Sequence, residues 1–357
     1  MPLLVAPPYK PPKVLSNQHL QTIFPTLFRK APKLNYLRER FELSDGDFLD
    51  LDGIAGNGKR LVIVLHGLEG SSDSKYVRGI LHHLNNLGWD GMAVNFRSCS
   101  GEPNRQSRFY HSGDTADLRE VINHVLRHCN YEGIDLVGFS LGGNVLLKYL
   151  GEEKEQAYRL RGRAVAISVP VDLVESAGIL DQRHNWLYRR RFMRKLNKKL
   201  QSKPDLLPHL QGKKMYHFAE FDEVVTAPLH GFASAPHYWQ SASCKPYLAH
   251  LKIPTLLINA LNDPFLGPKC FPEEAAKANP HFHLLTPEKG GHVGFPQWKS
   301  HKYWHEDRIH TFFLQGIQNA AEGPKLLEAF HPPAEKAKPD AEGENEPEPV
   351  NNSTLLL

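Results

Sequence analysis

The feature that most constrains the fold is the stretch 134–150. A short apolar run with β character is followed by Ser140 and then, without a breaker, by a helical pattern. Gly138, Ser140 and Gly142 form the pattern G-x-S-x-G between the strand and the helix. So sharp a turn predicts a positive φ at the serine, and glycines avoid clashes with the neighbouring strand and helix. The alternative is a glycine-rich turn with an incidental serine.

Apolar runs recur along the chain and alternate with helical periodicity. This alternation predicts an α/β fold with a mostly parallel central sheet and helices on both faces. The run Leu61–Leu65 is typical of a strand buried on both sides, and the first two strands flank a hairpin turn signal at 44–47. Strands are expected at 38–43, 48–52, 61–65, 92–96, 134–139, 164–168, 255–260 and 281–286. Helices are expected at 75–87, 115–129, 141–150, 272–278 and 305–319.

The alternation stops after Pro170, and residues 171–246 contain no strand-like run. An insertion of helices between two strands predicts a lid over a site at the strand ends. The proline-rich segment 1–37 is expected to form an ordered arm with a helical turn at His19–Phe24. Residues 1–320 are expected to form the catalytic domain, and the composition beyond it predicts a disordered acidic tail over 321–357.

Three residues have the order and placement of a nucleophilic triad. A serine is a weak nucleophile until a base takes its proton and an acid orients that base. In sheets of this kind the acid follows a late strand and the histidine follows the last one. Asp263 and His292 occupy these two places, so the sequence predicts Ser140, Asp263 and His292 as catalytic residues. Asp222 is a competing acid, but it lies in the expected lid, which favours Asp263.

An oxyanion needs two backbone donors in place before the reaction. The amide of Leu141, directly after the serine, is expected to be one of them. The loop His66–Leu68 follows a buried strand, and its Leu68 amide is expected to be the other. The alternative for this loop is a simple strand cap.

The sequence resembles the YheT-like branch of the α/β-hydrolases, which implies an N-terminal arm and a helical lid. The resemblance implies a serine hydrolase of carboxylic esters with short- to medium-chain acyl or lipid substrates, or acyl transfer in some relatives. Ser98 departs from the family, which usually has glycine there. The matching stretches are Asn17–Thr22, His66–Ser71, Ser100–Asn104, Tyr110–Gly113, Gly138–Asn144, Phe221–Asp222, His230–Phe232, Asn262–Phe265 and Gly290–Phe295.

Composition and residue spacing limit which cofactors, partners and cellular location are expected. The net charge of +4 does not call for nucleic acid, and the four cysteines lack the spacing of metal ligands. No cofactor and no metal are expected. The N-terminus lacks the charged region of a signal peptide, and no apolar run approaches the ~20 residues of a membrane span. A cytoplasmic protein is therefore expected.

The segment 182–204 holds nine basic residues and no acidic one, with Phe192, Leu196 and Leu200 spaced four apart. In one interpretation this lid helix packs its apolar face on the domain and its charges are solvated. In the other, the basic face makes weak contact with an anionic membrane surface. The nine are Arg183, Arg189, Arg190, Arg191, Arg194, Lys195, Lys198, Lys199 and Lys203. A non-catalytic membrane-surface protein is a third functional class, which an intact triad disfavours.

Two polar loops allow two interpretations each. Tyr110–Ser112 could line the acyl pocket or cap the helix that follows. Arg97 and the segment 102–105 could form a polar rim at the strand ends, although a structural network within the loops is favoured.

Overall fold

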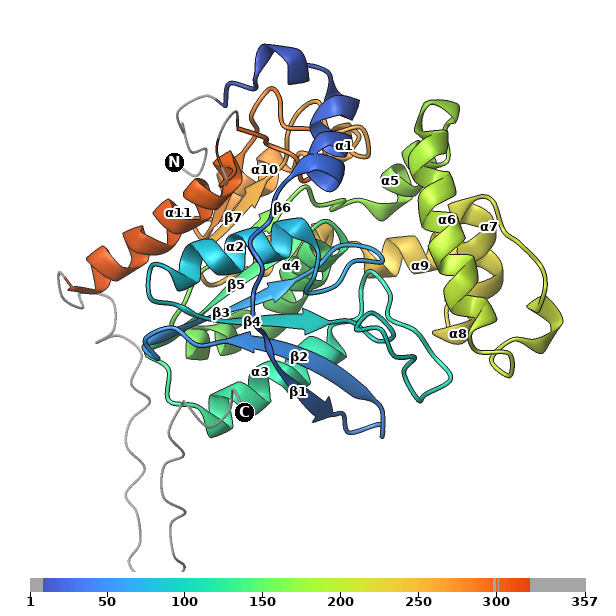
Figure 1. The fold of residues 1–357 in the computed structure, drawn as a ribbon, viewed down its shortest axis with the longest axis horizontal. Coiled ribbons are helices and arrows are strands. Elements are labelled where there is room, and N and C mark those ends of the chain that lie inside the picture. Colours follow the sequence, from blue (N-terminus) through green and yellow to red (C-terminus); the bar gives the residue numbers. More distant parts are fainter. Residues whose placement is uncertain (1–8, 298–299, 301, 322–357) are drawn as a thin grey trace, which may run out of the picture.

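The computed structural model describes residues 9–297, 300 and 302–321, and it centres on an eight-stranded sheet (Figure 1). The strand order across the sheet is β1-β2-β4-β3-β5-β6-β7-β8. β3 to β8 run parallel, whereas β1–β2 and β2–β4 are antiparallel pairs. The strands are β1 (Leu37–Glu42), β2 (Phe48–Ile54), β3 (Arg60–Leu65), β4 (Asp90–Asn95), β5 (Gly133–Phe139), β6 (Ala164–Ile167), β7 (Thr255–Ile258) and β8 (Phe282–Leu285). The predicted fold class is confirmed.

Helices cover both faces of this sheet. α2 (Lys75–Asn85) and α11 (Trp304–Ala321) pack on one face, where Ile80 and Ile309 share a core with Val64. α3 (Ala116–His128), α4 (Leu141–Glu153) and α10 (Glu273–Ala278) pack on the other. Adjacent strand residues alternate between the two cores, as Ile63 and Val64 do, because successive side chains of a strand point to opposite faces.

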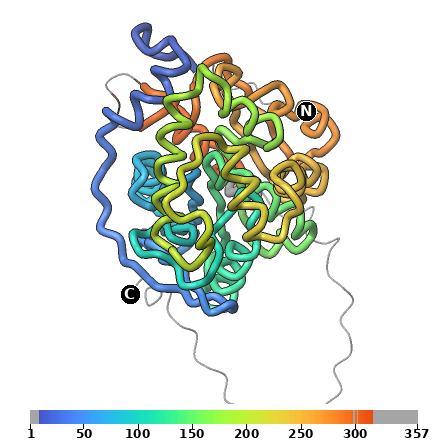
Figure 2. The backbone as a smooth tube through the Cα atoms, turned by 90° about the vertical axis from the view of Figure 1, so that its right-hand side faces the viewer, coloured from blue at the N-terminus to red at the C-terminus, as the bar shows by residue number. Residues whose placement is uncertain are grey.

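The chain leaves the sheet after β6 and returns at β7, and the regular elements described between them are all helical. We call residues 171–246 the insert. It extends from the carboxyl ends of the parallel strands and faces the viewer in Figure 2. Its helices are α5 (Leu173–Leu180), α6 (Trp186–Gln201), α7 (Phe218–Phe221), α8 (Ala227–Leu229) and α9 (Ala235–Ala242), with a π-helical turn at Asp222–Thr226 between α7 and α8. One further helical turn, Lys245–His250, precedes β7.

Helix α6 places its apolar side against the rest of the insert. Met193 and Leu200 are buried there, in a small core with Phe218 and Phe221, and Phe192 and Leu196 pack against the same core. The apolar spacing read from the sequence therefore marks an inward face.

The N-terminal arm carries a longer helix than the single turn expected. α1 (Gln18–Phe28) starts at Asn17, whose side chain accepts hydrogen bonds from the first helical amides. Arg29, at the end of this helix, pairs with Glu306 of α11, and both side chains are buried. The predicted acidic tail, apart from Ala321, lies outside the described residues. Within the described ranges, no helix is long and apolar enough to cross a bilayer.

Candidate active site

Ser140 lies at the sharp turn between β5 and α4. Its φ is +52° and its ψ is −118°, the conformation expected from the sequence. A Cβ at Gly138 would lie 2.7 Å from the carbonyl oxygen of Gly142, and a Cβ at Gly142 would lie 2.4 Å from that of His66. Both distances are too short for a side chain, so the turn requires glycine on each side of the serine. The Ser140 N–H donates to the Ile167 carbonyl at 2.8 Å, which fastens the turn to β6.

The structure brings the three predicted catalytic side chains together. His292 Nε2 lies 3.0 Å from Ser140 Oγ, and His292 Nδ1 lies 2.8 Å from Asp263 Oδ2. The carboxylate of Asp263 is fully buried, and its other oxygen accepts from the Phe265 N–H. The Phe265 ring packs 4.3 Å from the imidazole. With Nδ1–H directed at the carboxylate, Nε2 is free to take the serine proton.

The N-terminal arm holds the loop that carries His292. The Thr22 hydroxyl accepts from the His292 N–H at 2.9 Å, and the Gln21 side-chain oxygen accepts from the Gly290 N–H at 2.9 Å. Gln21 is fully buried and also accepts from the side chain of Asn262. No motif in the sequence predicted this role for Gln21 and Thr22. Their only signal was their place in one of the stretches shared with the family.

The two amides expected to bind an oxyanion both lie next to Ser140. Leu141 begins α4, and Gly67, which precedes Leu68, approaches so closely that a Cβ on it would lie 3.2 Å from Ser140 Cβ. Neither the Leu68 nor the Leu141 amide donates a hydrogen bond to any residue that the structure describes. Two free donors beside a serine suit a developing negative charge on oxygen.

His66 anchors this loop from below. Burial lowers the pKa of His66 to about 3, so the ring is neutral at physiological pH. Its Nδ1 lies 2.7 Å from the Gly67 carbonyl oxygen, and its Nε2 accepts from the Phe96 N–H. The hydrogen-bond partners therefore place the proton on Nδ1. His66 therefore links the loop to Phe96, directly after β4, which a simple strand cap would not do.

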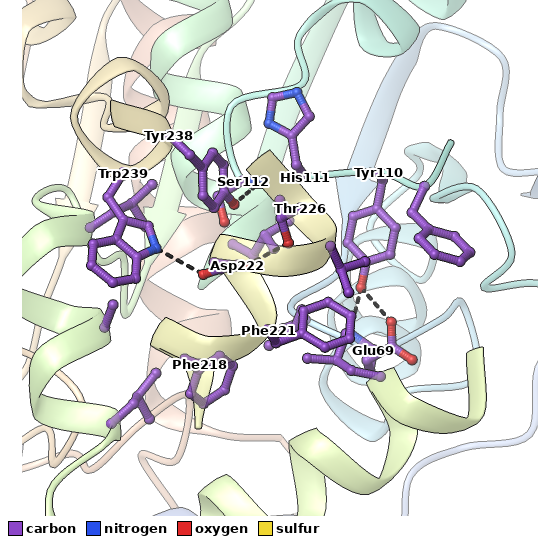
Figure 3. A pocket seen from close by; sticks show the side chains of 18 of the residues that line it. Glu69, Tyr110, His111, Ser112, Phe218, Phe221, Asp222, Thr226, Tyr238 and Trp239 are labelled. Carbon is purple, nitrogen blue, oxygen red and sulfur yellow. Dashed lines mark hydrogen bonds between the residues drawn. The ribbon is translucent and has the colours of Figure 1, made fainter. Parts of the chain in front are cut away.

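An apolar cavity of about 130 Å³ opens from Ser140 into the insert (Figure 3). Tyr110, His111 and Ser112 line it, which favours a place in a pocket over a helix cap for that loop. Its apolar lining includes Leu173, Leu180, Phe218, Phe221, Val225 and Leu229.

Asp222 projects into this cavity and not toward the imidazole. Thr226 Oγ1 donates to Asp222 Oδ1 at 2.6 Å, and Trp239 Nε1 donates to Oδ2 at 2.8 Å (Figure 3). Burial raises the pKa of Asp222 to about 6. The carboxylate that contacts His292 is that of Asp263.

A second cavity, of about 310 Å³, meets the first at Ser140. It lies between the arm and α6 and is lined by His292, Thr22 and Tyr188, together with both apolar and charged side chains. The charged ones are Arg29, Glu69, Asp73, Lys75, Arg191 and Lys195. Ser140 thus faces one apolar and one more polar space.

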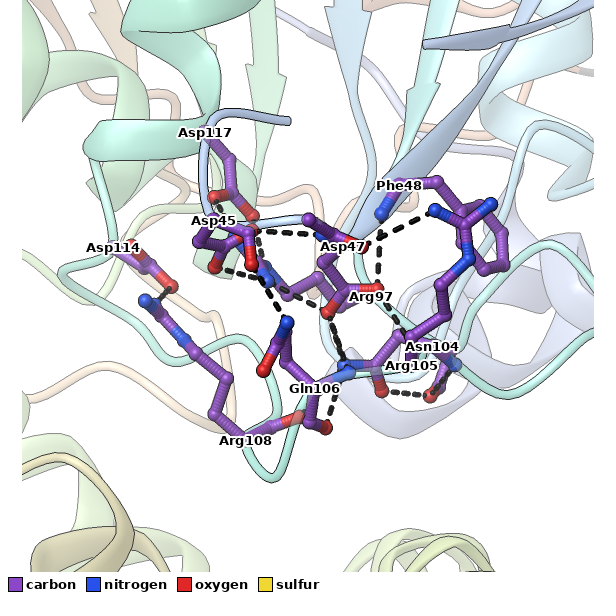
Figure 4. A network of polar contacts seen from close by, with 12 residues as sticks. Asp45, Asp47, Phe48, Arg97, Asn104, Arg105, Gln106, Arg108, Asp114 and Asp117 are labelled. Carbon is purple, nitrogen blue, oxygen red and sulfur yellow. Dashed lines mark hydrogen bonds and ion pairs between the residues drawn. The ribbon is translucent and has the colours of Figure 1, made fainter. Parts of the chain in front are cut away.

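Arg97 belongs to a buried structural network, as the sequence analysis favoured (Figure 4). Its guanidinium pairs with Asp47 at 2.7 Å and with Asp117 at 2.6 Å, and Asn104 donates to the same Asp47 carboxylate. None of these four residues lines either cavity at Ser140. Ser98 next to Arg97 has a φ of +60°, a conformation that favours the glycine usual in the family.

Across the described ranges, no group of three or more His, Cys, Asp or Glu side chains has an arrangement that could hold a metal ion.

Comparison with known proteins identifies the family. The model of the alpha/beta hydrolase fold matches residues 60–297. YheT of Escherichia coli is 37% identical over 295 residues, which cover 80% of this chain and 86% of YheT. The phospholipase ABHD3 of Mus musculus is 29% identical, over 83% of this chain and 75% of its own. The esterase Pf2001 of Pyrococcus furiosus has the same fold, with a TM-score of 0.54 at 19% identity over 79% of this chain and 91% of its own. The chain therefore belongs to the α/β hydrolase fold family, and within it to the YheT-like branch.

Proposed function

We propose that this ester hydrolase cleaves carboxylic esters through an acyl-serine intermediate on Ser140, with His292 as base and Asp263 as the acid that orients it. The observation that carries the proposal is the unbroken chain of short contacts: 3.0 Å from serine to imidazole and 2.8 Å from imidazole to carboxylate. A relative named as a phospholipase and a solved esterase of the same fold also support it.

The reaction runs in two halves. His292 takes the proton of Ser140 as the serine oxygen bonds to the ester carbonyl carbon, and the Leu68 and Leu141 amides bind the resulting oxyanion. The imidazolium then gives its proton to the departing alkoxide, which leaves as an alcohol. Water attacks the acyl-serine in the same way, His292 takes its proton and returns it to Ser140, and the carboxylic acid is released.

The two cavities indicate how the ester is oriented, with its alcohol in one and its acyl chain in the other. The leaving alcohol receives its proton from His292, and His292 lines the second cavity but not the apolar one. The alcohol therefore belongs in the more polar space between the arm and α6. The acyl chain belongs in the apolar cavity under the insert, which suits short- to medium-chain or lipid acyl groups.

The outer surface of the insert supports weak contact with an anionic membrane. Trp186 and Leu187, at the start of α6, are 53% and 50% exposed. Six cations of the same segment are also exposed: Arg183, Arg190, Arg191, Arg194, Lys195 and Lys198. Apolar and basic side chains on one exposed surface are typical of interfacial binding.

A panel of p-nitrophenyl esters of graded chain length tests the proposal. Wild type should hydrolyse the shorter esters, and Ser140→Ala should lose several orders of magnitude in kcat while keeping its fold. A fluorophosphonate probe should label wild type and not the variant. Addition of a simple alcohol to the same assay distinguishes acyl transfer, which would yield a new ester. Retention of more than about a tenth of the turnover by Ser140→Ala would reject Ser140 as the nucleophile.

A further inference from the structure

The turn that carries the Leu68 amide has a strained member. Residues 67–70 form a turn closed by a hydrogen bond of 3.0 Å from the Gly70 N–H to the Gly67 carbonyl. Glu69, in the third position, has a φ of +53°. A residue other than glycine stays in this backbone conformation only where the surrounding structure stabilises it. Because Leu68 directly precedes Glu69, the direction of the Leu68 amide depends on what holds the glutamate.

Every polar group of Glu69 is engaged, and helix α6 of the insert engages two of them. Lys199 Nζ donates to the Glu69 carboxylate at 2.6 Å, and Lys195 Nζ donates to the Glu69 carbonyl oxygen at 2.7 Å. The Tyr110 hydroxyl accepts from the Glu69 N–H at 2.8 Å and donates to the carboxylate at 3.0 Å. The side chains of Lys199 and Glu69 are only 9% and 8% exposed. This ion pair is therefore a buried bond between the insert and the turn.

The Lys199 ammonium has further partners beside Glu69. Its ammonium also lies 3.2 Å from Cys99 Sγ and 4.7 Å from the centre of the Tyr110 ring. Burial opposes its charge, but the neighbouring Cys99 and Glu69 outweigh that effect and raise the pKa of Lys199. Lys203, one turn further along the chain, also contacts the rest of the domain, but there it donates to the Gln106 carbonyl. The contacts of Lys195 and Lys199 with Glu69 can therefore be separated from the other contacts that dock α6 on the rest of the domain.

We propose that Lys195 and Lys199 are positioning residues, which hold the strained turn 67–70 in the shape in which the Leu68 amide faces Ser140. This inference rests on the proposed function, because it assigns the Leu68 amide to the oxyanion. It links the insert to catalysis: when α6 is docked, the oxyanion donors are in place, and when α6 moves away, Glu69 loses two of its partners and the turn relaxes.

Four lysine-to-methionine variants test it in the full-length protein. Lys199→Met and Lys195→Met each remove one contact to Glu69. Lys195→Met is the milder change, since this side chain is exposed, and it serves if the buried variant folds poorly. Lys203→Met removes a contact that docks the insert elsewhere, and Lys198→Met removes an exposed charge from the same helix.

The readouts are kcat and KM for a short p-nitrophenyl ester, and the affinity of an alkyl trifluoromethyl ketone, which forms an oxyanion on the serine. Loss of a whole oxyanion donor costs about 10²–10³ in kcat, so its misplacement should cost about tenfold to a hundredfold. We expect kcat and the affinity of the ketone to fall together in Lys199→Met and Lys195→Met, with KM little changed. Lys203→Met and Lys198→Met should match wild type.

Equal losses in Lys199→Met and Lys203→Met would overturn the proposal, because they would show an effect of docking alone. A change in KM without a change in kcat would overturn it as well. The Ser140→Ala variant separates this failure from a failure of the proposed function. If Ser140→Ala is inactive while Lys199→Met and Lys195→Met behave as wild type, only the role of the two lysines is rejected.

Discussion

Replacement of Asp222 by asparagine should stabilise the folded protein, and more so as the pH rises. The carboxylate is partly buried beside the apolar cavity and accepts one bond from Thr226 and one from Trp239. An asparagine keeps both bonds if its oxygen accepts from the indole and its amide donates to the hydroxyl, which can rotate. The variant therefore removes the charge and little else.

The magnitude follows from the pKa. Burial raises the pKa of Asp222 from 3.8 to about 6, so the folded protein holds this proton to a higher pH than the unfolded chain does. The stability of the protonated form is fully present below about pH 4 and is lost as the pH rises through 6. One pKa unit corresponds to about 1.4 kcal/mol, so the loss reaches about 3 kcal/mol at pH 8, of which roughly half has occurred at pH 5.

Chemical unfolding at pH 5 and pH 8, followed by tryptophan fluorescence, measures this effect. The free energy of unfolding of Asp222→Asn, relative to wild type, should rise by about 1.5 kcal/mol between the two pH values. Asp205→Asn, at an exposed position of the same insert, is the control and should show no such rise. If Asp222→Asn gains no stability over wild type between pH 5 and pH 8, the carboxylate is not destabilised by burial and the reasoning is wrong.

Four further expectations concern the site and the surface. Asp263→Asn should lower kcat by orders of magnitude and far more than Asp222→Asn does, because it removes the partner that orients His292; the reverse order would move the acid into the insert. Thr22→Val leaves the backbone N–H of His292 without its acceptor, so we expect a loss of about 1–3 kcal/mol in stability and of about tenfold to a hundredfold in kcat, whereas Thr22→Ser should retain both. Activity should survive exhaustive chelation, and a loss that a divalent ion restores would contradict the serine mechanism. In co-sedimentation the protein should bind vesicles rich in anionic lipid at low salt, by on the order of 1 kcal/mol per exposed cation, and release them as salt rises; equal, negligible binding to neutral and anionic vesicles at low salt would reject the contact.

Much of the fold could be predicted because its signals are local. The run Leu61–Leu65 of β3 is continuously apolar, and the turn at Ser140 needs two glycines whatever surrounds it. The order of strands across the sheet is not local: β2 pairs with β4 and not with β3, which follows it in the chain. Such a pairing joins distant segments, and no pattern within either strand encodes it.

The polar contacts around the site were harder to predict for a related reason. Gln21 and Thr22 resemble ordinary polar residues of a surface helix, and their partners lie about 270 residues away. The nine cations of the segment 182–204 look alike in the sequence. In the structure Lys195, Lys199 and Lys203 reach polar partners outside the insert, because a long side chain can cover apolar surface and still reach a polar partner.

The hydrogen bonds between the N-terminal arm and the loop of His292 have a consequence for the synthesis of the protein. Residues 21 and 22 leave the ribosome before the glycine and the histidine that they bind, which come 269 and 270 residues later. Ser140 lies between these two segments in the chain, so it is synthesised after the arm and before the loop of His292. A nascent chain therefore carries the proposed nucleophile over 152 residues before the proposed base follows. Under the proposed mechanism, hydrolysis begins only after the arm and the loop of His292 have met, so a chain that ends before this loop cannot attack esters around it.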